Sequence, residues 1–293
     1  MEKQSKPRLF CFGLGYSAQA LGRQLLAEGW RVAGTARSPE RLDALTAQGF
    51  EAFAFDRDRP LADPERALAG SSHFLTSVPP DLAGDPVLDH HESDILDARP
   101  RWVGYLSTTG VYGNADGGWV DESSPRVPST ANSQRRKLAE DAWLELHESQ
   151  ALPVHIFRLS GIYGPGRSQL DTVRAGRAKR LVKPGQVFNR IHVDDIASVL
   201  RASIAKPNPG AAYNLADDLP APAPDVVTFA CELLGVRPPP EQPFDPEALS
   251  PMARTFYADN KRVANARIKT ELGVRLIYPD YRAGLAAQLK AER

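Results

Sequence analysis

Short apolar runs alternate with amphipathic stretches along the first half of the chain. Apolar runs bounded by glycine, proline or polar residues are typical of buried strands, and apolar residues at helical spacing are typical of packed helices. The predicted strands are residues 9–12, 31–36, 50–55, 73–77, 102–107 and 154–159. The predicted helices are residues 18–28, 39–48, 87–98 and 131–149. Such alternation implies right-handed crossovers, and we expect an α/β fold with a doubly wound parallel sheet.

The longest predicted helix, residues 131–149, has an apolar face. This face contains Leu138, Ala142 and Leu146, with Trp143 beside it. We expect it to pack on the sheet, because a helix buries its apolar stripe against a neighbouring element.

The second half of the chain has a different character. A Gly-Pro-Gly turn and a basic stretch follow Ile162, and a helix signal begins near Val193. Residues 212–215 could form another strand. Residues 217–246 are rich in proline, which suits surface loops with one helix at residues 226–234. This predicts a smaller, loop-rich part that follows the large sheet.

A glycine-rich turn joins the first predicted strand to the first predicted helix. Its sequence is Gly13-Leu14-Gly15-Tyr16-Ser17-Ala18. Between a strand and a helix, the first glycine allows the tight turn, and the second lets the backbone approach a pyrophosphate at the helix N-terminus. Ala18 still permits close packing of helix on strand. A ligand-free turn is the alternative, but the βαβ context favours a Rossmann-type dinucleotide site.

The end of the second predicted strand indicates which dinucleotide is preferred. An NAD site usually has a carboxylate there for the ribose 2′-hydroxyl, whereas this chain has Arg37, 22 positions after Gly15. A guanidinium pairs well with a phosphate, and Ser38 and Arg41 could add donors. We expect NADP(H) to be preferred, with NAD(H) still possible. A solvated arginine that starts a helix is the alternative reading of Arg37.

Polar residues at the ends of two further strands are candidate cofactor ligands. Asp56 follows the third strand and could accept a hydrogen bond from the adenine amine. Thr76 and Ser77 end the fourth strand and could contact the ribose or the pyrophosphate. A turn carboxylate and a plain strand-to-loop exit are equally good readings of these residues.

Taken together, several segments resemble the extended and atypical short-chain dehydrogenase/reductases of the nucleoside-diphosphate-sugar epimerase/dehydratase superfamily. Besides the glycine-rich turn, these segments are 107–113 (STTGVYG), 158–166 (RLSGIYGPG), 189–197 (NRIHVDDIA) and 213–215 (YNL). The resemblance spans residues 9 to about 215 and does not single out one substrate.

The resemblance implies a division of labour along the chain. Residues 1–163, joined by residues 189–216, would form an NAD(P)-binding Rossmann domain. Residues 164–188 and 217–293 would form a smaller substrate lobe. The implied activity is that of an oxidoreductase or an epimerase/dehydratase, which acts on a sugar nucleotide or another small hydroxy or keto compound. The family also allows a homodimer.

The resemblance also implies catalytic positions. In the family, a Ser or Thr orients the substrate, and a Tyr-x-x-x-Lys pair supplies the acid/base and the lysine that holds the nicotinamide ribose. Thr108 matches the first position and Lys137 the lysine, but Ser133 occupies the place of the tyrosine. An aliphatic hydroxyl is far too weak an acid to replace a phenol with a pKa near 10.

A substitute acid/base is not evident from the sequence. No tyrosine occurs between Tyr112 and Tyr163. Tyr112 is a conceivable substitute, although packing beside the fifth strand is its commoner role. Tyr163 and His192 are weaker candidates, and His192 suits the cap of a helix start better than a base. A cofactor-binding sensor or regulatory protein without catalysis therefore competes with the enzyme.

Composition excludes some classes of protein. Lys+Arg and Asp+Glu both number 36, which gives no electrostatic case for nucleic acid or an acidic membrane. No apolar run reaches membrane-spanning length, and we expect no secretory segment at the start of the chain. Cys11 and Cys231 have no metal or CxxC spacing, and the histidines are scattered. We expect a cytoplasmic protein without a metal.

The basic stretch between residues 167 and 190 contains one acid, Asp171. It falls where the resembling family builds its substrate lobe, and an anionic nucleotide-sugar diphosphate would suit it. Arg167 and Arg190 are the candidate substrate ligands. A solvated face is the alternative, since charge runs are usually solvated.

Overall fold

The computed structural model describes residues 6–292, except for the side chains of residues 251–253. Its contacts form two compact units. Unit 1 consists of the residues up to Ser107 together with Gln134–Arg158 and Ile196–Tyr213. Unit 2 consists of Thr108–Ser133, Leu159–Asp195 and the residues from Asn214 onward. The contacts thus group four segments that we expected in the Rossmann domain with unit 2, namely residues 108–133, 159–163, 189–195 and 214–216. The division into a cofactor part and a substrate part stays a prediction.

Most of unit 1 is built on a seven-stranded sheet. Its strands, within the described residues, are β1 (Arg8–Phe12), β2 (Arg31–Ala36), β3 (Glu51–Ala54), β4 (His73–Thr76), β5 (Trp102–Thr108), β7 (Val154–Leu159) and β11 (Ala212–Leu215). Their order in space is β11-β7-β5-β4-β1-β2-β3. β1 pairs in parallel with both β2 and β4, so the strand order reverses there. Such a switch point is where open α/β sheets bind ligands, at the carboxyl ends of the strands.

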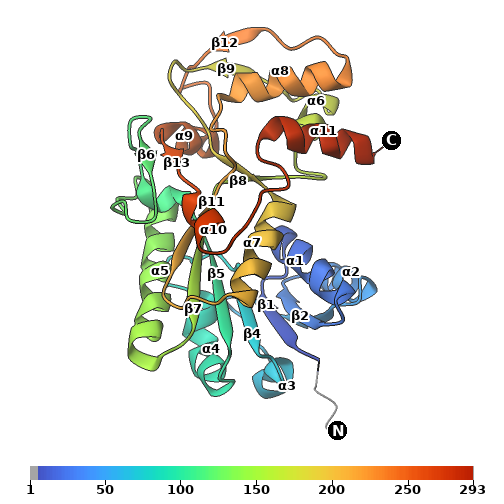
Figure 1. The fold of residues 1–293 in the computed structure, drawn as a ribbon, viewed down its shortest axis with the longest axis vertical. Helices are drawn as coiled ribbons and strands as arrows, with labels where there is room; N and C mark the ends of the chain where they lie inside the picture. The colour runs from blue at the N-terminus through green and yellow to red at the C-terminus, as the bar shows by residue number, and fades with distance from the viewer. Residues whose placement is uncertain (1–5, 293) are drawn as a thin grey trace. The chain divides into compact units, whose positions relative to one another are not determined.

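Helices cover both faces of this sheet, which confirms the predicted doubly wound fold. The helices are α1 (Tyr16–Ala27), α2 (Pro39–Ala47), α3 (Pro64–Leu68), α4 (Pro86–Asp97), α5 (Ala131–Gln150) and α7 (Val193–Ala205). Figure 1 shows α4 and α5 on one side of the strands and α1, α2 and α7 on the other. Every residue of β1 is buried, as a central parallel strand requires.

The predicted apolar face of α5 is only partly right. The buried residues of this helix are Ala139, Glu140, Trp143 and Leu146, whereas the side chain of Leu138 is 63% exposed. The helix is therefore rotated from the predicted face, and a carboxylate points into the core. A sequence pattern that counts only apolar residues cannot foresee a buried charge.

That carboxylate belongs to a buried ion pair inside unit 1. Arg158 Nη2 on β7 lies 2.9 Å from Glu140 Oε2, and both side chains are almost fully buried. Ser107 Oγ on β5 also donates to Glu140. A buried charge must be paired and hydrogen-bonded, so these contacts connect α5 to two central strands.

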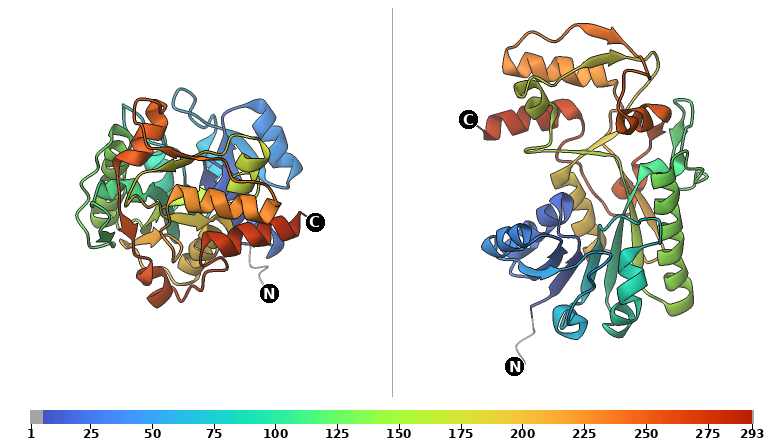
Figure 2. Two further views of the ribbon diagram at one scale, coloured as in Figure 1. Left: turned by 90° about the horizontal axis from the view of Figure 1, so that it is seen from above. Right: turned by 180° about the vertical axis from the view of Figure 1, so that it is seen from behind.

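Unit 2 is assembled from short elements. They are η1 (Thr109–Tyr112), β6 (Trp119–Val120), β8 (Gly161–Tyr163), α6 (Gln169–Arg174), β9 (Arg180–Val182), β10 (Arg190–His192), α8 (Ala223–Leu234), β12 (Glu241–Pro243), α9 (Pro251–Ala258), β13 (Arg262–Val263), α10 (Ala266–Thr270) and α11 (Tyr281–Ala291). The strands form the parallel pairs β8–β10, β9–β12 and β6–β13. In Figure 2, α8 (orange) and α11 (red) lie side by side, and their core includes Val226, Ala230 and Leu285. Strands of two or three residues have no readable periodicity, so the sequence did not predict them.

None of the described helices is both long and apolar enough to cross a membrane.

Candidate functional site

The glycine-rich turn lies at the carboxyl end of β1 and is braced by both neighbouring strands. Gly13 N donates to Thr35 Oγ1 at 2.8 Å, and Ser77 Oγ donates to Gly13 O at 2.6 Å. Gly13 has φ +82°, and a Cβ there would lie 2.8 Å from Ser77 Oγ. Only glycine fits this position. Ser77, a predicted cofactor ligand, thus uses its hydroxyl to support the turn.

The N-terminus of α1 follows this turn and is open. Gly15 is the N-cap, no side chain caps the helix, and its first turn has no acidic residue. A Cβ at Gly15 would meet nothing within 4 Å. The first N–H groups of a helix have no partner within it, and the helix dipole favours an anion there. Ser17 and Ala18 are buried beneath. Residues Gly13 to Ala18 therefore fit the pyrophosphate of a dinucleotide.

The remaining predicted cofactor residues of unit 1 have varied surroundings. Arg37 is exposed at the end of β2. Asp56 accepts from Asp58 N and forms an ion pair with Arg59 at 2.9 Å. Thr76 Oγ1 is buried, with no hydrogen-bond partner among the described residues. An unpaired buried hydroxyl at the end of β4 is compatible with a ligand contact.

Lys137 and the residues that carry the other predicted catalytic positions belong to different units. Lys137 on α5 is half-exposed, and its Nζ lies 2.9 Å from Asp141 Oδ2. In unit 2, Thr108 Oγ1 accepts from Gly110 N at 3.1 Å and thereby caps η1. A Cβ at Gly110 would lie 2.5 Å from Ser133 Oγ, so Ser133 packs on the turn that follows Thr108. The joint action of Thr108 and Lys137 stays a prediction.

The candidate substitutes for the missing tyrosine all have structural contacts. The hydroxyl of Tyr112, which is 4% exposed, donates to Asn214 Oδ1 at 2.7 Å. Burial raises the pKa of Tyr163, whose ring packs against His192. His192 Nδ1 accepts from Asp194 N at 3.2 Å at the start of α7, as expected of a helix cap. These contacts favour the packing reading of Tyr112.

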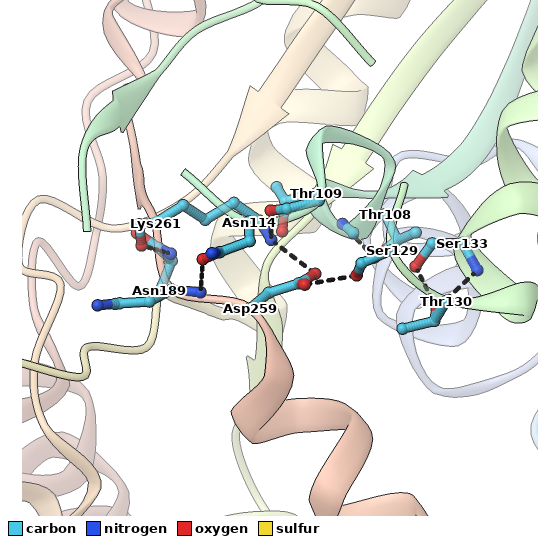
Figure 3. Close-up of polar contacts among 12 residues, drawn as sticks. Thr108, Thr109, Asn114, Ser129, Thr130, Ser133, Asn189, Asp259 and Lys261 are labelled. Atoms are coloured by element: carbon cyan, nitrogen blue, oxygen red, sulfur yellow. Dashed lines mark hydrogen bonds and ion pairs between the residues drawn. The ribbon is translucent and has the colours of Figure 1, made fainter. Parts of the chain in front are cut away.

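Sequence reasoning missed a buried lysine beside the turn that follows Thr108. Lys261 is 8% exposed, and its Nζ donates to Gly113 O at 2.7 Å and lies 3.3 Å from Asp259 Oδ2. Ser129 Oγ donates to Asp259 Oδ1 at 2.5 Å (Figure 3). Burial lowers the pKa of Lys261. Asp259 and Lys261 thus connect η1 to the segment before α5. A single Lys in a polar segment gives no sequence signal for this role.

We expect Lys261→Met to destabilise the protein. The substitution keeps the apolar stem but removes the donor to Gly113 O, which should cost about 1–3 kcal/mol in the free energy of unfolding. Lys269→Met is the matched control, because Lys269 pairs with Asp218 at the surface and should cost less than about 1 kcal/mol. Denaturant unfolding monitored by circular dichroism measures both. Equal losses in the two variants would contradict the role of Lys261.

Much of the basic stretch is engaged within unit 2. Arg174 pairs with Glu292, and Arg180 pairs with Glu241. Of the two predicted substrate ligands, Arg167 is exposed in the turn with Gly164. Arg190 is half-buried; its Nη1 donates to the carbonyls of residues 188 and 221, and burial lowers its pKa. Their contact with a substrate stays a prediction.

Asp217 is a buried carboxyl near Arg190. Its side chain accepts from Leu219 N, but Oδ2 has no partner among the described residues. Burial raises the pKa of Asp217 to about 7, with Asp218 and Asp280 adding to the rise and Arg190 opposing it. A buried carboxylate with an unpaired oxygen is costly when ionised.

This carboxyl should make stability depend on pH. A group with a raised folded pKa stabilises the fold at low pH, and here that stability is lost from about pH 4, the unfolded value, up to about pH 7. We therefore expect the Tm to fall between about pH 4 and about pH 7, and Asp217→Asn to weaken this fall. Asp43→Asn, which removes an exposed carboxylate on α2 away from Asp217, should leave the slope unchanged. The role of Asp217 is refuted if its variant keeps the wild-type pH dependence. Thermal unfolding across this range is the measurement.

No group of three or more metal-ligating side chains is assembled within residues 6–292.

Known proteins resemble this chain in sequence and in fold. No protein-family model matches the chain. The chain is 49% identical to a conserved protein of unknown function from Silicibacter pomeroyi, over 98% of this chain and 99% of that one, with TM-score 0.91. It is 28% identical to protein YeeZ of Escherichia coli K12, over 92% of this chain and 95% of that protein.

Two further structures carry enzyme names. A protein from Methylobacillus flagellatus, provisionally named an NAD-dependent epimerase/dehydratase, is 27% identical over 98% of this chain and 99% of its own, with TM-score 0.71. The dTDP-glucose 4,6-dehydratase DesIV of Streptomyces venezuelae, solved with NAD and TYD bound, is 19% identical over 97% of this chain and 96% of its own; its TM-score of 0.75 shows a shared fold. In sequence and in fold, this chain resembles members of the NAD-dependent epimerase/dehydratase superfamily. The resemblance inferred from its motifs is thus confirmed.

Proposed function

We propose that this protein is a member of the epimerase/dehydratase superfamily that binds NADP(H) and uses it in oxidoreductase or epimerase/dehydratase chemistry. The substrate would be a sugar nucleotide or another small hydroxy or keto compound. The observation that carries the proposal is the open N-terminus of α1, where Gly15 has free space above it and Gly13 is braced by Thr35 and Ser77. Such a helix end is suited to a pyrophosphate.

The preference for NADP(H) over NAD(H) rests on Arg37. β2 ends at Ala36 and is followed by Arg37, whereas NAD sites usually have at this position a carboxylate that holds the ribose 2′-hydroxyl. The Arg37 guanidinium forms no ion pair or hydrogen bond among the described residues, so it is available for a phosphate. A guanidinium and a phosphate form charge-assisted, often bidentate, hydrogen bonds.

We expect Arg37→Ala to weaken NADPH binding and to leave NADH binding nearly unchanged. A hydrogen bond to a charged group contributes about 1.5–3 kcal/mol, which corresponds to roughly a tenfold to hundredfold change in Kd. Arg23→Ala, an exposed substitution on α1, is the control. Titration calorimetry measures the Kd of each variant for both cofactors. Equal affinities of the wild-type protein for NADPH and NADH would overturn the preference.

The catalytic roles follow the resemblance and remain part of the proposal. When bound, the nicotinamide ring would donate or accept a hydride. Thr108 would orient the reacting hydroxyl or carbonyl, and Lys137 would hold the nicotinamide ribose. Lys137 must then leave or share its pairing with Asp141. Arg190 would be a contact for an anionic part of the substrate. Incubation with NADP(H) and a panel of sugar nucleotides and carbonyl compounds, monitored by reduced-nicotinamide absorbance and by product analysis, tests turnover.

A non-catalytic dinucleotide sensor is the second candidate function. Ser133 replaces the tyrosine of the family pattern, and Tyr112 is buried and hydrogen-bonded to Asn214. Each observation removes one candidate for the general acid/base. Tight NADPH binding without turnover of any substrate in the panel would favour the sensor. Loss of a measured turnover in Thr108→Val, with NADPH affinity retained, would favour the enzyme.

A further inference from the structure

We propose that Arg59 is a second cationic contact for the 2′-phosphate of NADP(H), held in place by Asp56 and by the main chain of residue 37. This inference rests on the proposed preference for NADP(H). It assigns a new residue to that preference, one that the sequence pattern did not indicate.

A tight turn after β3 sets the position of Arg59. Asp56 N donates to Arg59 O at 3.0 Å, and Arg59 N donates to Asp56 O at 3.2 Å. Inside the turn, Asp56 Oδ1 accepts from Asp58 N at 3.1 Å. The chain therefore reverses over four residues. This reversal lets Arg59 Nη2 pair with Asp56 Oδ2 at 2.9 Å.

The same guanidinium reaches the end of β2. Arg59 Nη2 donates to Arg37 O at 2.5 Å, and β2 and β3 are adjacent strands in which Ala36 pairs with Ala54. The carboxyl end of β2 is where Rossmann folds read the 2′ position of the adenosine ribose. The pairing of β2 with β3 thus brings Arg59, 22 positions later in the chain, to the site assigned to Arg37.

Arg59 retains donors for an anion in this position. Both of its hydrogen bonds use Nη2, so the N–H groups of Nε and Nη1 have no partner among the described residues. A guanidinium presents its N–H groups as a planar fork that matches a phosphate. The 2′-phosphate carries close to two negative charges, and Arg37 supplies one positive charge.

Both cationic and acidic side chains lie around this site, and their balance favours a bound phosphate. Arg37 and Arg41 bond no carboxylate within residues 6–292. The acids close in sequence, besides Asp56, are Glu40, which is exposed and hydrogen-bonded to Ser38, and the exposed Asp43 and Asp58. Asp56 offsets part of the charge of Arg59 and also fixes its orientation. A held guanidinium loses less conformational entropy when it binds an anion than a free one does.

Cofactor discrimination separates this role from a purely structural one. If Arg59 only stabilises the turn, its removal should affect NADPH and NADH binding equally. If it contacts the 2′-phosphate, removal should affect only ligands that carry that group. An exposed ion pair contributes little to stability, so the fold should survive the substitution.

The experiment compares Arg59→Ala with wild type by titration calorimetry. The ligands are NADPH, NADH, adenosine 2′,5′-bisphosphate and adenosine 5′-monophosphate. We expect the two 2′-phosphorylated ligands to bind about tenfold more weakly to the variant, and the other two to change by less than about twofold. Arg23→Ala is the matched control and should change none of the four. Arg59→Gln, which keeps a donor for Arg37 O, serves as the second variant if thermal unfolding shows that Arg59→Ala is destabilised.

Each outcome tests the proposed preference for NADP(H), the proposed role of Arg59, or both. A wild-type protein that binds NADPH and NADH equally overturns both. A wild-type preference for NADPH that Arg37→Ala abolishes but Arg59→Ala leaves unchanged overturns only the role of Arg59. An equal loss of NADPH and NADH affinity in Arg59→Ala shows a structural role and also overturns it. A selective loss of 2′-phosphorylated ligands supports the inference.

Discussion

Replacing Gly15 with aspartate is expected to abolish dinucleotide binding while the fold stays intact. Gly15 has φ −87° and ψ −162°, which any residue adopts, and a Cβ there meets no atom within 4 Å. The carboxylate would occupy the space proposed for the pyrophosphate and repel it. Like charges placed together cost several kcal/mol, so we expect the Kd for NADPH to rise at least about hundredfold. Titration calorimetry gives the Kd.

The stability of the Gly15→Asp variant, unlike its affinity for NADPH, should not fall. Aspartate is a favoured N-cap residue, and α1 has no side-chain cap, so Gly15→Asp should leave the Tm unchanged or raise it. Gly15→Ala is the control, since a methyl group adds bulk without charge and should weaken binding less. A Gly15→Asp variant that still binds NADPH as tightly as wild type would remove the α1 N-terminus as the cofactor site.

Breaking the buried ion pair of unit 1 is expected to have the largest effect on stability. Glu140→Gln leaves the buried Arg158 guanidinium without its carboxylate partner. Arg158→Met leaves the buried Glu140 carboxylate without its guanidinium partner. Removal of one partner of a buried pair costs about 3–5 kcal/mol, which approaches the whole stability of many domains. Denaturant unfolding measures the change in the free energy of unfolding.

Two control variants test whether the loss of stability comes from leaving a buried charge unpaired. Arg174→Ala removes an exposed pair with Glu292 and should cost less than about 1 kcal/mol. The double variant Glu140→Leu with Arg158→Met removes both charges and should recover part of the loss of stability, because no buried charge remains. A single-variant loss as small as that of Arg174→Ala would show that Glu140 does not depend on Arg158.

The position of Glu140 illustrates why the core could only partly be predicted. The sequence correctly placed a long helix at residues 131–149, because its helical pattern extends over several turns. The sequence pattern wrongly placed Leu138 in the core and left out Glu140. Glu140 is polar, and its partner Arg158 lies on a distant strand, β7. A buried charge is stable only through such a partner, and the identity of the partner depends on how the elements pack.

The glycine-rich turn between β1 and α1 was predicted more fully than the rest of the structure. Gly13 and Gly15 follow a strand and precede a helix, and the backbone geometry of that turn depends on residues adjacent in the chain. By contrast, Lys261 bonds Gly113 across 148 positions. Arg59 reaches Arg37 O because β2 and β3 pair. Neither contact has a sequence spacing that predicts it.

The sequence by itself therefore determined the alternation of strands and helices, the glycine-rich turn and the resemblance to the superfamily. These depend on local periodicity and on the backbone freedom of glycine, which a sequence displays directly. Only the tertiary structure decided which face of α5 is buried, which residues brace the turn, and which cations gather at the end of β2. Those features depend on strand order and on side-chain contacts between distant residues, whose free energy exists only when the chain is folded.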